Sequence, residues 1–464
     1  MAIFRCSVAL LLSSVAWAAG APRINWQEVN PETLRHFTEL LRIDTRNPPG
    51  NETKAAEYLR AVLEREGIVV KLLALEPERA NLVARLKGDG SARPIALLGH
   101  TDVVGVERSR WSVDPFAAVR KRGYIYGRGA VDDKVHVAAE LMVMLLLSRE
   151  HVRLKRDVIF IAEAGEEGST NVGIDYLVGR HWRTIAAEYA LAEGGGGVAQ
   201  GGNVRYVAIT AAEKVPRGVR LTAHGRAGHA SRPTPDNAVV RLANAVAKLA
   251  AWRTPVRLNE TTRAYFKQLA SISPPDDADR YRHVEDATRG PEIDRYFERY
   301  EPAHFAMIHT TLAPTMLKAG IGFNVIPAEA EGFVDIRTLP DEDLPRFYEE
   351  LRAVIGDAAV TVEPRRPTRP ATPPSPTDSA LYRALEHAQQ RLFPEAITLP
   401  AMLTAATDLA QLRARGVQAY GFGPIEEAGD PRGEAHADNE RLPEPSLYRL
   451  VEFLWNAVVE VASE

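Results

Sequence analysis

The stretch VIFIAEAGEEGST, residues 158–170, places two adjacent carboxylates directly after an apolar run. The run from Val158 to Ala162 predicts a buried strand, and the small residues after it predict a turn. Glu166 and Glu167 lie in that turn. Taken alone, such a pair indicates a solvated acidic loop, because adjacent negative charges repel and each raises the pKa of the other. A cation held nearby would offset that repulsion.

The composition is that of an ordinary globular protein. The chain has 464 residues, a formal net charge of -4, 45% hydrophobic residues and 25% charged residues. This length predicts two or three domains, and the hydrophobic content is sufficient for a sizeable core. The absence of a basic excess argues against nucleic acid as a partner.

The first 18 residues predict a signal peptide. MAIFR carries one positive charge, CSVALLLSSVA is apolar, and AWA fits the small-x-small cleavage pattern. The protein is therefore expected to be exported, periplasmic or secreted, without stable membrane insertion after cleavage. An uncleaved anchor is the alternative. The only cysteine, Cys6, lies in this segment, so a metal site in the mature chain would be built from His, Asp and Glu. Such ligands suit zinc, manganese or cobalt.

Helical and strand patterns alternate through the first part of the chain, residues 19–213. RPIALLGH and EYALAE read as strands, like residues 158–162, and DDKVHVAAELMVMLLLSRE reads as a long apolar helix. This alternation predicts an α/β fold with a mostly parallel sheet flanked by helices. In such sheets, ligands bind outside the carboxyl ends of the strands.

The pattern changes near Lys214. Residues 214–363 read as an inserted α+β unit, which includes an acidic, partly helical stretch at 255–303 whose role the pattern does not indicate. A proline-rich connector follows, and the rest of 364–464 returns to helix–strand alternation and completes the first domain.

Four charged features cluster at the predicted carboxyl ends of first-domain strands, the second of them at the start of the long helix, and a fifth lies near the C-terminus. They are His100 with Asp102, Asp132 with Asp133, Glu166 with Glu167, Glu193, and His436. Each has an ordinary alternative: a core histidine, a helix N-cap, a solvated loop or a flexible glycine turn. Their joint placement at one edge of a sheet favours a site.

The residue types fit two metal ions. His100 would ligate one ion and His436 the other, Asp132 would bridge them, and Glu167 and Glu193 would complete the two sets. Asp102 could accept the second ring N–H of His100, and Glu166 would be the general base. A mononuclear zinc site is the alternative, and it would leave Glu193 or His436 without a role.

Seven motifs together resemble the co-catalytic zinc peptidase family. They are HTDVV, YGRGAVDDK, AGEEGS, LAEGGGG, GRAGHASRP, NVIPAEAEGFVDIR and AHADNE. Members of this family include glutamate carboxypeptidase, aminoacylase, carnosinase and succinyl-diaminopimelate desuccinylase. Within it, the chain is most similar to the Gly-X carboxypeptidases and the secreted N-acyl amino acid hydrolases.

The resemblance implies a role for each matching residue. The ligands of two zinc ions, for which Mn²⁺ or Co²⁺ could substitute, would be His100, Asp132, Glu167, Glu193 and His436. Asp102 and Glu166 would be catalytic, and a cis peptide bond would join Asp132 to Asp133. The inserted unit would be a lid and dimerisation domain, making the protein a homodimer in which His229 reaches the partner's active site. Substrate contacts would come from Asn324, Arg337, Ala406 and Thr407.

The expected function is that of an exported dinuclear zinc hydrolase. It would cleave a peptide or N-acyl amide bond next to an amino acid with a free carboxylate, in the manner of a carboxypeptidase or dipeptidase. An N-acyl amino acid amidohydrolase is one alternative, and a catalytically silent peptide-binding module is another. For Arg337, the alternative is an ion pair with Asp335 or Asp341. The chain departs from the family at Val135 and in the TAATD turn, where the family commonly has glycine.

Overall fold

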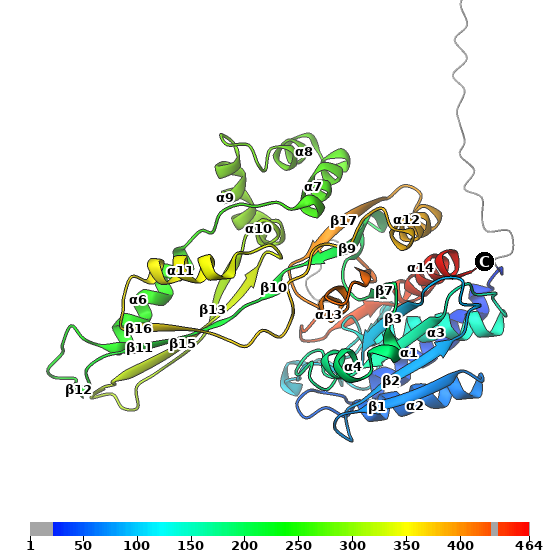
Figure 1. The fold of residues 1–464 in the computed structure, drawn as a ribbon, viewed down its shortest axis with the longest axis horizontal. Coiled ribbons are helices and arrows are strands. Elements are labelled where there is room, and N and C mark those ends of the chain that lie inside the picture. The colour runs from blue at the N-terminus through cyan, green and yellow to red at the C-terminus, as the bar shows by residue number, and fades with distance from the viewer. Residues whose placement is uncertain (1–21, 428–434, 464) are drawn as a thin grey trace, which may run out of the picture.

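The computed structural model describes residues 22–427 and 435–463 of the chain, so the expected signal peptide at 1–18 lies outside the described residues. A ten-stranded mixed sheet, here called the central sheet, forms the core of the larger lobe, in the order β1-β2-β6-β3-β7-β18-β9-β8-β19, with β17 paired to β9 (Figure 1). Its strands are β1 (Val69–Ala74), β2 (Ala80–Leu86), β3 (Ile95–His100), β6 (Val158–Glu163), β7 (Tyr189–Ala192), β8 (Gly196–Gln200), β9 (Asn203–Glu213), β17 (Ile397–Leu403), β18 (Gln418–Gly421) and β19 (Ile425–Glu427).

The middle of this sheet is parallel. Strand β3 lies parallel to both β6 and β7, and β7 lies parallel to β18. At one edge, β1 pairs antiparallel with β2, and β2 with β6. Toward the other edge, β9 pairs antiparallel with β18 and with β8, whereas β17 lies parallel to β9 and β19 parallel to β8. The strands β3 and β6 are buried at every position, as expected for strands covered on both faces. The predicted α/β fold class is confirmed.

Helices cover both faces of the central sheet. One face carries α1 (Trp26–Arg42), α2 (Glu52–Arg65), α3 (Lys134–Arg149), α12 (Ala380–Leu392) and α14 (Glu444–Ala462), which share the largest hydrophobic cluster. The other face carries α4 (Ile174–Arg180), α5 (Trp182–Ile185) and α13 (Leu409–Arg413). Helix α3 is buried almost all round, which explains its continuous apolar sequence. A small sheet of β4 (Val119–Lys121), β5 (Tyr124–Tyr126) and β20 (Arg441–Pro443), and the 3-10 turn η1 (Arg108–Arg110), complete this part.

A second, antiparallel sheet extends away from the first as an arm (Figure 1). It contains β10 (Val215–Pro216), β11 (Val219–His224), β13 (Thr311–Ala319), β15 (Glu329–Thr338) and β16 (Val360–Pro364). Helices α6 (Ala238–Ala251) and α11 (Leu344–Ile355) pack on it around a separate hydrophobic cluster. Every second residue of β15 is buried, as expected for a sheet with one covered face. The short pair β12 (Gly228–His229) and β14 (Val325–Ile326) forms the far end of the arm (Figure 1).

Four further helices account for the stretch at 255–303 and the residues just after it. They are α7 (Glu260–Ile272), α8 (Pro275–Arg282), α9 (Gly290–Tyr300) and α10 (Pro302–Ile308). Their apolar side chains pack with Leu399, Ala401 and Met402 of β17 and with Ala212 of β9. The four helices are therefore joined to the central sheet through α7, which contacts β17 and β9, although the chain around them belongs to the arm.

No helix within residues 22–427 and 435–463 combines the length and apolar character that crossing a membrane requires.

Candidate active site

Two groups of side chains share the carboxylate of Asp132. Its Oδ1 lies 2.8 Å from Nε2 of His100, and its Oδ2 lies 3.2 Å from Nε2 of His436. Glu193 adds an oxygen 3.9 Å from Nε2 of His100, and Glu167 adds one 2.8 Å from Nε2 of His436. The five predicted ligand residues therefore form two sets, each with one imidazole and one carboxylate of its own, joined by Asp132.

The central sheet brings these residues together from distant parts of the chain. His100 is the last residue of β3, Glu167 lies in the turn after β6, and Glu193 follows β7. Because these three strands are adjacent and parallel, their carboxyl ends meet at one edge, as predicted. Asp132 lies just before α3, and His436 lies in the segment before β20.

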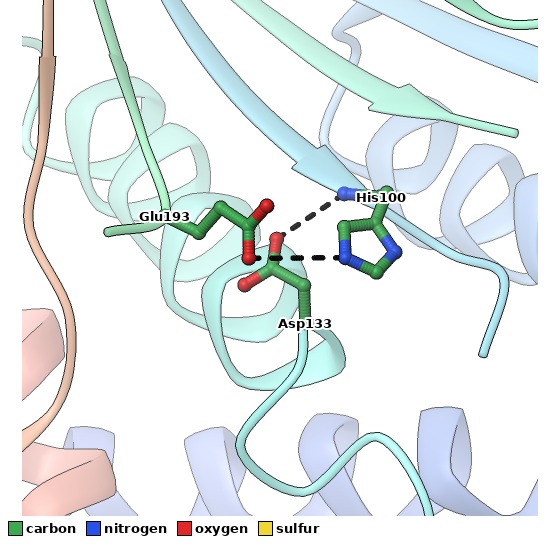
Figure 2. A group of neighbouring side chains, drawn as sticks. All are labelled: His100, Asp133 and Glu193. Carbon is green, nitrogen blue, oxygen red and sulfur yellow. Dashed lines mark hydrogen bonds and ion pairs between the residues drawn. The ribbon is translucent and has the colours of Figure 1, made fainter. Parts of the chain in front are cut away.

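Asp133 also lies in this group, but its oxygens have other partners. Oδ2 accepts a hydrogen bond of 3.2 Å from the backbone N–H of His100, and Oδ1 contacts Nδ1 of His136. Figure 2 shows Asp133 beneath His100 and Glu193. The side chain is fully buried, so its role is to orient the end of β3. The peptide bond between Asp132 and Asp133 is cis, which confirms that expectation.

His100 is held in the tautomer that suits a metal ligand. Its Nδ1 lies 3.0 Å from the backbone oxygen of Asp102 and 3.5 Å from the Asp102 carboxylate. The ring N–H therefore donates to the carbonyl rather than to the carboxylate that the sequence suggested. This hydrogen bond places the proton on Nδ1 and leaves the Nε2 lone pair facing Asp132 and Glu193.

The Asp102 carboxylate instead holds the turn that carries the two glutamates. Oδ1 accepts from the backbone N–H of Glu166 at 3.0 Å, and Oδ2 accepts from that of Glu167 at 3.1 Å. The side-chain amide of Asn47 donates to Oδ2 as well, at 3.0 Å. Asp102 is fully buried, and three N–H donors satisfy its charge.

The two adjacent glutamates point to different partners. Glu167 faces His436, whereas Oε1 of Glu166 accepts a hydrogen bond of 2.6 Å from Nη2 of Arg369. Arg369 also lies 2.8 Å from Asp408. Burial and the nearby Asp408 raise the pKa of Glu166 to about 8. Arg369 comes from the proline-rich connector, and no pattern in the sequence marked it as part of the site.

Glu440 is a second residue that sequence reasoning missed. Its carboxylate accepts from the backbone N–H of Val131 at 2.7 Å and of Asp132 at 3.2 Å. It also binds Arg128 at 2.6 Å, and Arg128 donates to the backbone oxygen of His436 at 3.3 Å. Glu440 thus ties the loop of Asp132 to the segment of His436. The residue stands in the motif AHADNE, so the signal that could have found it was present.

The donor set fits two divalent metal ions. It contains two imidazole nitrogens and carboxylate oxygens, with no thiolate, which is typical of catalytic zinc, manganese or cobalt sites. The surplus of carboxylates also requires a counter-charge. Hydrogen bonds to Asp132 and Glu167 raise the pKa of His436 to about 10, and burial together with Asp132 raises the pKa of Glu193 well above its usual range. Cations placed between these groups would offset the repulsion.

A cavity of about 680 Å³ opens over this cluster. Its walls include Glu166, Arg337, Ala406 and Thr407, so the predicted substrate residues Arg337, Ala406 and Thr407 lie beside the cluster. Arg337 also forms the predicted alternative contact, an ion pair of 2.8 Å with Asp335. The hydroxyl of Thr407 donates to buried Glu213 at 2.7 Å, which fixes the turn.

His229 and Asn324 do not line this cavity. His229 lies in β12, Asn324 directly precedes β14, and the backbone N–H of Ala230 donates to the Asn324 oxygen at 3.0 Å. Both residues therefore occupy the far end of the arm, away from the central sheet (Figure 1). Within one chain, the structure brings the ligand set, Asp102 and Glu166 together with the predicted substrate residues Arg337, Ala406 and Thr407. His229 and Asn324 lie apart from this group.

Comparison with known proteins identifies the family. The profile of peptidase family M20/M25/M40 matches residues 96–460, which is most of the chain. The chain belongs to this family. It is 29% identical to aminoacylase-1B of Rattus norvegicus over 434 residues, covering 92% of this chain and 94% of that protein. It is 27% identical to the N-fatty-acyl-amino acid synthase/hydrolase PM20D1 of Homo sapiens over 445 residues, covering 92% and 86% of the two chains.

A solved structure supports the fold. The M20 family metallo-carboxypeptidase Sso-CP2 from Sulfolobus solfataricus matches with a TM-score of 0.71 and 18% identity, over 93% of this chain and 99% of that one. The resemblance drawn from the motifs is thus confirmed. This M20 protein is a metal-dependent hydrolase of amide bonds, of the peptidase and aminoacylase type. The silent peptide-binding alternative is not supported.

Proposed function

We propose that this M20 enzyme is an exported dinuclear zinc hydrolase that releases an amino acid with a free carboxylate from a peptide or an N-acyl amino acid. The observation that carries the proposal is the division of the cluster around Asp132. One carboxylate oxygen faces His100 and the other faces His436. A site for one ion would not need a carboxylate shared between two imidazoles. The signal-like pattern at residues 1–18 supports export.

In this proposal, His100 and Glu193 would hold one ion, His436 and Glu167 would hold the other, and Asp132 would serve both. Zinc bound there would supply Lewis acidity, which polarises a carbonyl and lowers the pKa of a water molecule. Manganese or cobalt could substitute, because the donors are nitrogen and oxygen only.

Glu166 is the proposed general base and acid. It lies on the wall of the cavity beside the ligand set, and Arg369 binds its Oε1. Its other oxygen would take the proton from the attacking water and then deliver it to the nitrogen of the leaving amino acid. Burial and the nearby Asp408 raise the pKa of this carboxyl group, which favours uptake of a proton from water.

Arginines of the cavity are proposed to bind the substrate carboxylate. Arg337 lies on its wall, and Arg365 and Arg366 lie there as well. A guanidinium can bind a carboxylate through two parallel hydrogen bonds, which selects for substrates that carry this group. Nε of Arg337 donates a hydrogen bond of 2.8 Å to Oδ1 of Asp335, which orients the guanidinium. Backbone atoms of Ala406 and Thr407 would contact the other side of the substrate.

His229 is proposed to act in the site of a second subunit. The backbone N–H of Ser231 donates to its Nδ1 at 3.1 Å, so the neutral ring carries its proton on exposed Nε2. That N–H could stabilise the oxyanion formed during amide cleavage. The apolar residues Ile321 and Phe323, near the same end of the arm, are fully exposed and would be covered in a dimer. Asn324 would enter the partner's cavity together with His229.

The proposed domain division is residues 19–213 and 364–464 for the catalytic domain and 214–363 for the inserted lid and dimerisation domain. The separate hydrophobic cluster of the arm supports this division. Helices α7 to α10 are an exception within the insertion, because they share a hydrophobic cluster with strands β9 and β17 of the catalytic sheet.

The test is release of free amino acid by purified enzyme from a panel of dipeptides and N-acyl amino acids. We expect hydrolysis of compounds with a free carboxylate and not of the matching amides, and chelation should abolish it. Arg337→Met should raise KM for the free acids by roughly tenfold or more, as for loss of a charged hydrogen-bonding pair. Equal hydrolysis of the acids and the amides would contradict carboxylate selection.

A further inference from the structure

A second pocket, here called the side pocket, lies between helices α7 and α10 and the central sheet. It has a volume of about 260 Å³. Its helical wall is formed by Tyr265, Ala303 and Met307, and its floor includes the β17 residues Ala401 and Met402. These helices form the stretch to which the sequence assigned no role. Their packing on the sheet creates a pocket that the sheet alone would not have.

Strand β9 supplies a row of side chains along this pocket. Tyr206, Ala208 and Thr210 all line it, as expected for alternate residues of one strand, whereas Val207 and Ile209 face the opposite core. The row from Tyr206 to Thr210 spans about 13 Å, at 3.3 Å per residue. The pocket therefore has the length of an extended chain rather than of a compact group.

One end of the row adjoins the metal-ligand cluster. Thr210 pairs with Gly421, which packs directly against the backbone of Glu193 and Gly194. Gly194 lines the large cavity and the next residue, Gly195, lines the side pocket, while Leu403 lines both. The two spaces are thus neighbours across Leu403 and the glycine pair. A substrate with its amide carbonyl at the cluster could extend into the side pocket.

Thr210 has a buried hydroxyl in need of a partner. The side chain is 1% exposed, and Oγ1 forms no hydrogen bond within the described part of the chain. An unsatisfied buried hydroxyl is costly, so a ligand that offers a polar atom there is favoured. Thr210 lies at the end beside Glu193, where the polar amide group of a substrate would pass. Farther along the row, Ala208, Met307 and the rings of the two tyrosines offer mainly apolar surface.

The large cavity and the side pocket differ in the charge of their lining residues. The large cavity contains Arg337, Arg365 and Arg366, whereas no lysine, arginine or histidine is found among the described residues that line the side pocket. Among the described residues that line the side pocket, Glu426 carries the only carboxylate. The carboxylate end of a substrate therefore fits the cavity, and an uncharged apolar end fits the side pocket.

We propose that the side pocket binds a long apolar acyl group, so that the preferred substrates are N-acyl amino acids with a medium or long aliphatic chain. This inference rests on the proposed function, because it places the scissile amide at the cluster. A cavity of about 150 Å³ is enough for a benzene ring, so the larger side pocket has room for such a chain. Each methylene that leaves water strengthens binding by about fourfold.

Chain-length dependence of hydrolysis tests the proposal. The substrates are N-acetyl, N-hexanoyl and N-decanoyl derivatives of one amino acid, and kcat/KM is expected to rise with each lengthening, by more than tenfold from the shortest to the longest. Two variants narrow the pocket: Ala303→Trp, at an exposed position on α10, and Ala208→Phe on β9. Each should reduce kcat/KM for the decanoyl compound at least tenfold more than for the acetyl compound. Ala251→Trp, at an exposed position on α6, is the matched control and should leave this ratio unchanged.

A binding measurement separates this proposal from the proposed function. Decanoate is titrated calorimetrically into the metal-loaded enzyme, with acetate as reference. Tight binding that both pocket variants weaken at least tenfold supports the side pocket even if no N-acyl amino acid is hydrolysed, a result that would overturn only the proposed function. Hydrolysis without a gain from chain length, or equal losses for both substrates in the variants, overturns the side pocket and leaves the proposed function standing. If the enzyme shows no hydrolysis and no binding of decanoate, both proposals are overturned.

Discussion

Adjacent residues in this site can have separate roles because one buried carboxylate fixes the backbone between them. Asp102 accepts from the backbone N–H groups of both Glu166 and Glu167, so the turn presents the two side chains in fixed and different directions. One faces Arg369 and the other faces His436. The repulsion expected for two neighbouring carboxylates is thereby reduced, since each faces a basic side chain of its own.

Substitution of each glutamate distinguishes these roles. Glu166→Gln should retain the metal and the fold but lower kcat by roughly 10²–10⁴, because only proton transfer is removed. Glu167→Gln should instead lose metal, since it removes a ligand oxygen beside His436. Metal content measured by elemental analysis, together with kcat, checks both expectations. Loss of metal from the Glu166 variant and retention in the Glu167 variant would show that the roles are reversed.

Among single residues, the sequence identifies those site residues that lie at the ends of predicted strands. His100, Glu167 and Glu193 were found because each lies at the end of a recognisable strand or in the turn that follows it, and parallel strands end at the same edge. Arg369 could not be found in this way. It lies in a segment without regular structure, and its partners Glu166 and Asp408 are distant in the sequence. Only the folded chain places its charge at the site.

Among the elements, the predicted helices and the central parallel strands were correct, because buried strands and apolar helices carry strong hydrophobic patterns. The outer strands were harder to predict. A flexible turn was the ordinary alternative for the run of glycines at 194–197, yet Gly196 and Gly197 begin β8. Strand β13 is mostly exposed, so its sequence lacks the alternation that marks a half-buried strand.

The junction between β9 and β10 contains a buried lysine. Nζ of Lys214 donates to the backbone oxygen of Ala306 at 3.0 Å and to Oγ1 of Thr311 at 2.8 Å, so it joins α10 to the base of the arm. Burial lowers its pKa from 10.5 to about 7. Nearby Arg337 also lowers this pKa, whereas Asp335 and Glu342 raise it.

This lowered pKa predicts a pH dependence of stability. Between pH 7 and about 10 the unfolded chain binds a proton at Lys214 that the folded chain has released, so the free energy of unfolding rises with pH across this window. The gain is at most about 1.4 kcal/mol per pH unit. Chemical denaturation at pH 7, 8 and 9 gives the free energy of unfolding of the wild type and of Lys214→Met. The wild-type value minus the variant value should increase as pH rises. A difference independent of pH would mean that Lys214 titrates normally.

For the whole molecule, the distance between the arm's far end and the cluster requires a second subunit if His229 is catalytic. His229 and the exposed residues Ile321 and Phe323 occupy that end, whereas the ligand set lies on the central sheet. A two-fold dimer would cover the apolar residues and bring each His229 to the other subunit's site.

Mixing two inactive variants tests this arrangement. Glu166→Ala and His229→Ala should each be inactive or nearly so, and their mixture should recover up to about a quarter of wild-type activity. Half of the randomly formed dimers are mixed, and one site of each mixed dimer has both residues intact. Subunit exchange is verified with fluorescent labels on the two variants. Exchange without recovered activity would place His229 outside the partner's site.

The central claim is a pair of metal ions bridged by Asp132. The most direct measurement is anomalous diffraction at the zinc edge from crystals of enzyme purified without chelator. Two peaks are predicted, one between His100 and Glu193 and the other between His436 and Glu167, with Asp132 contacting both. A single peak in fully active enzyme, or ions held by Asp133 in place of Asp132, would contradict the account.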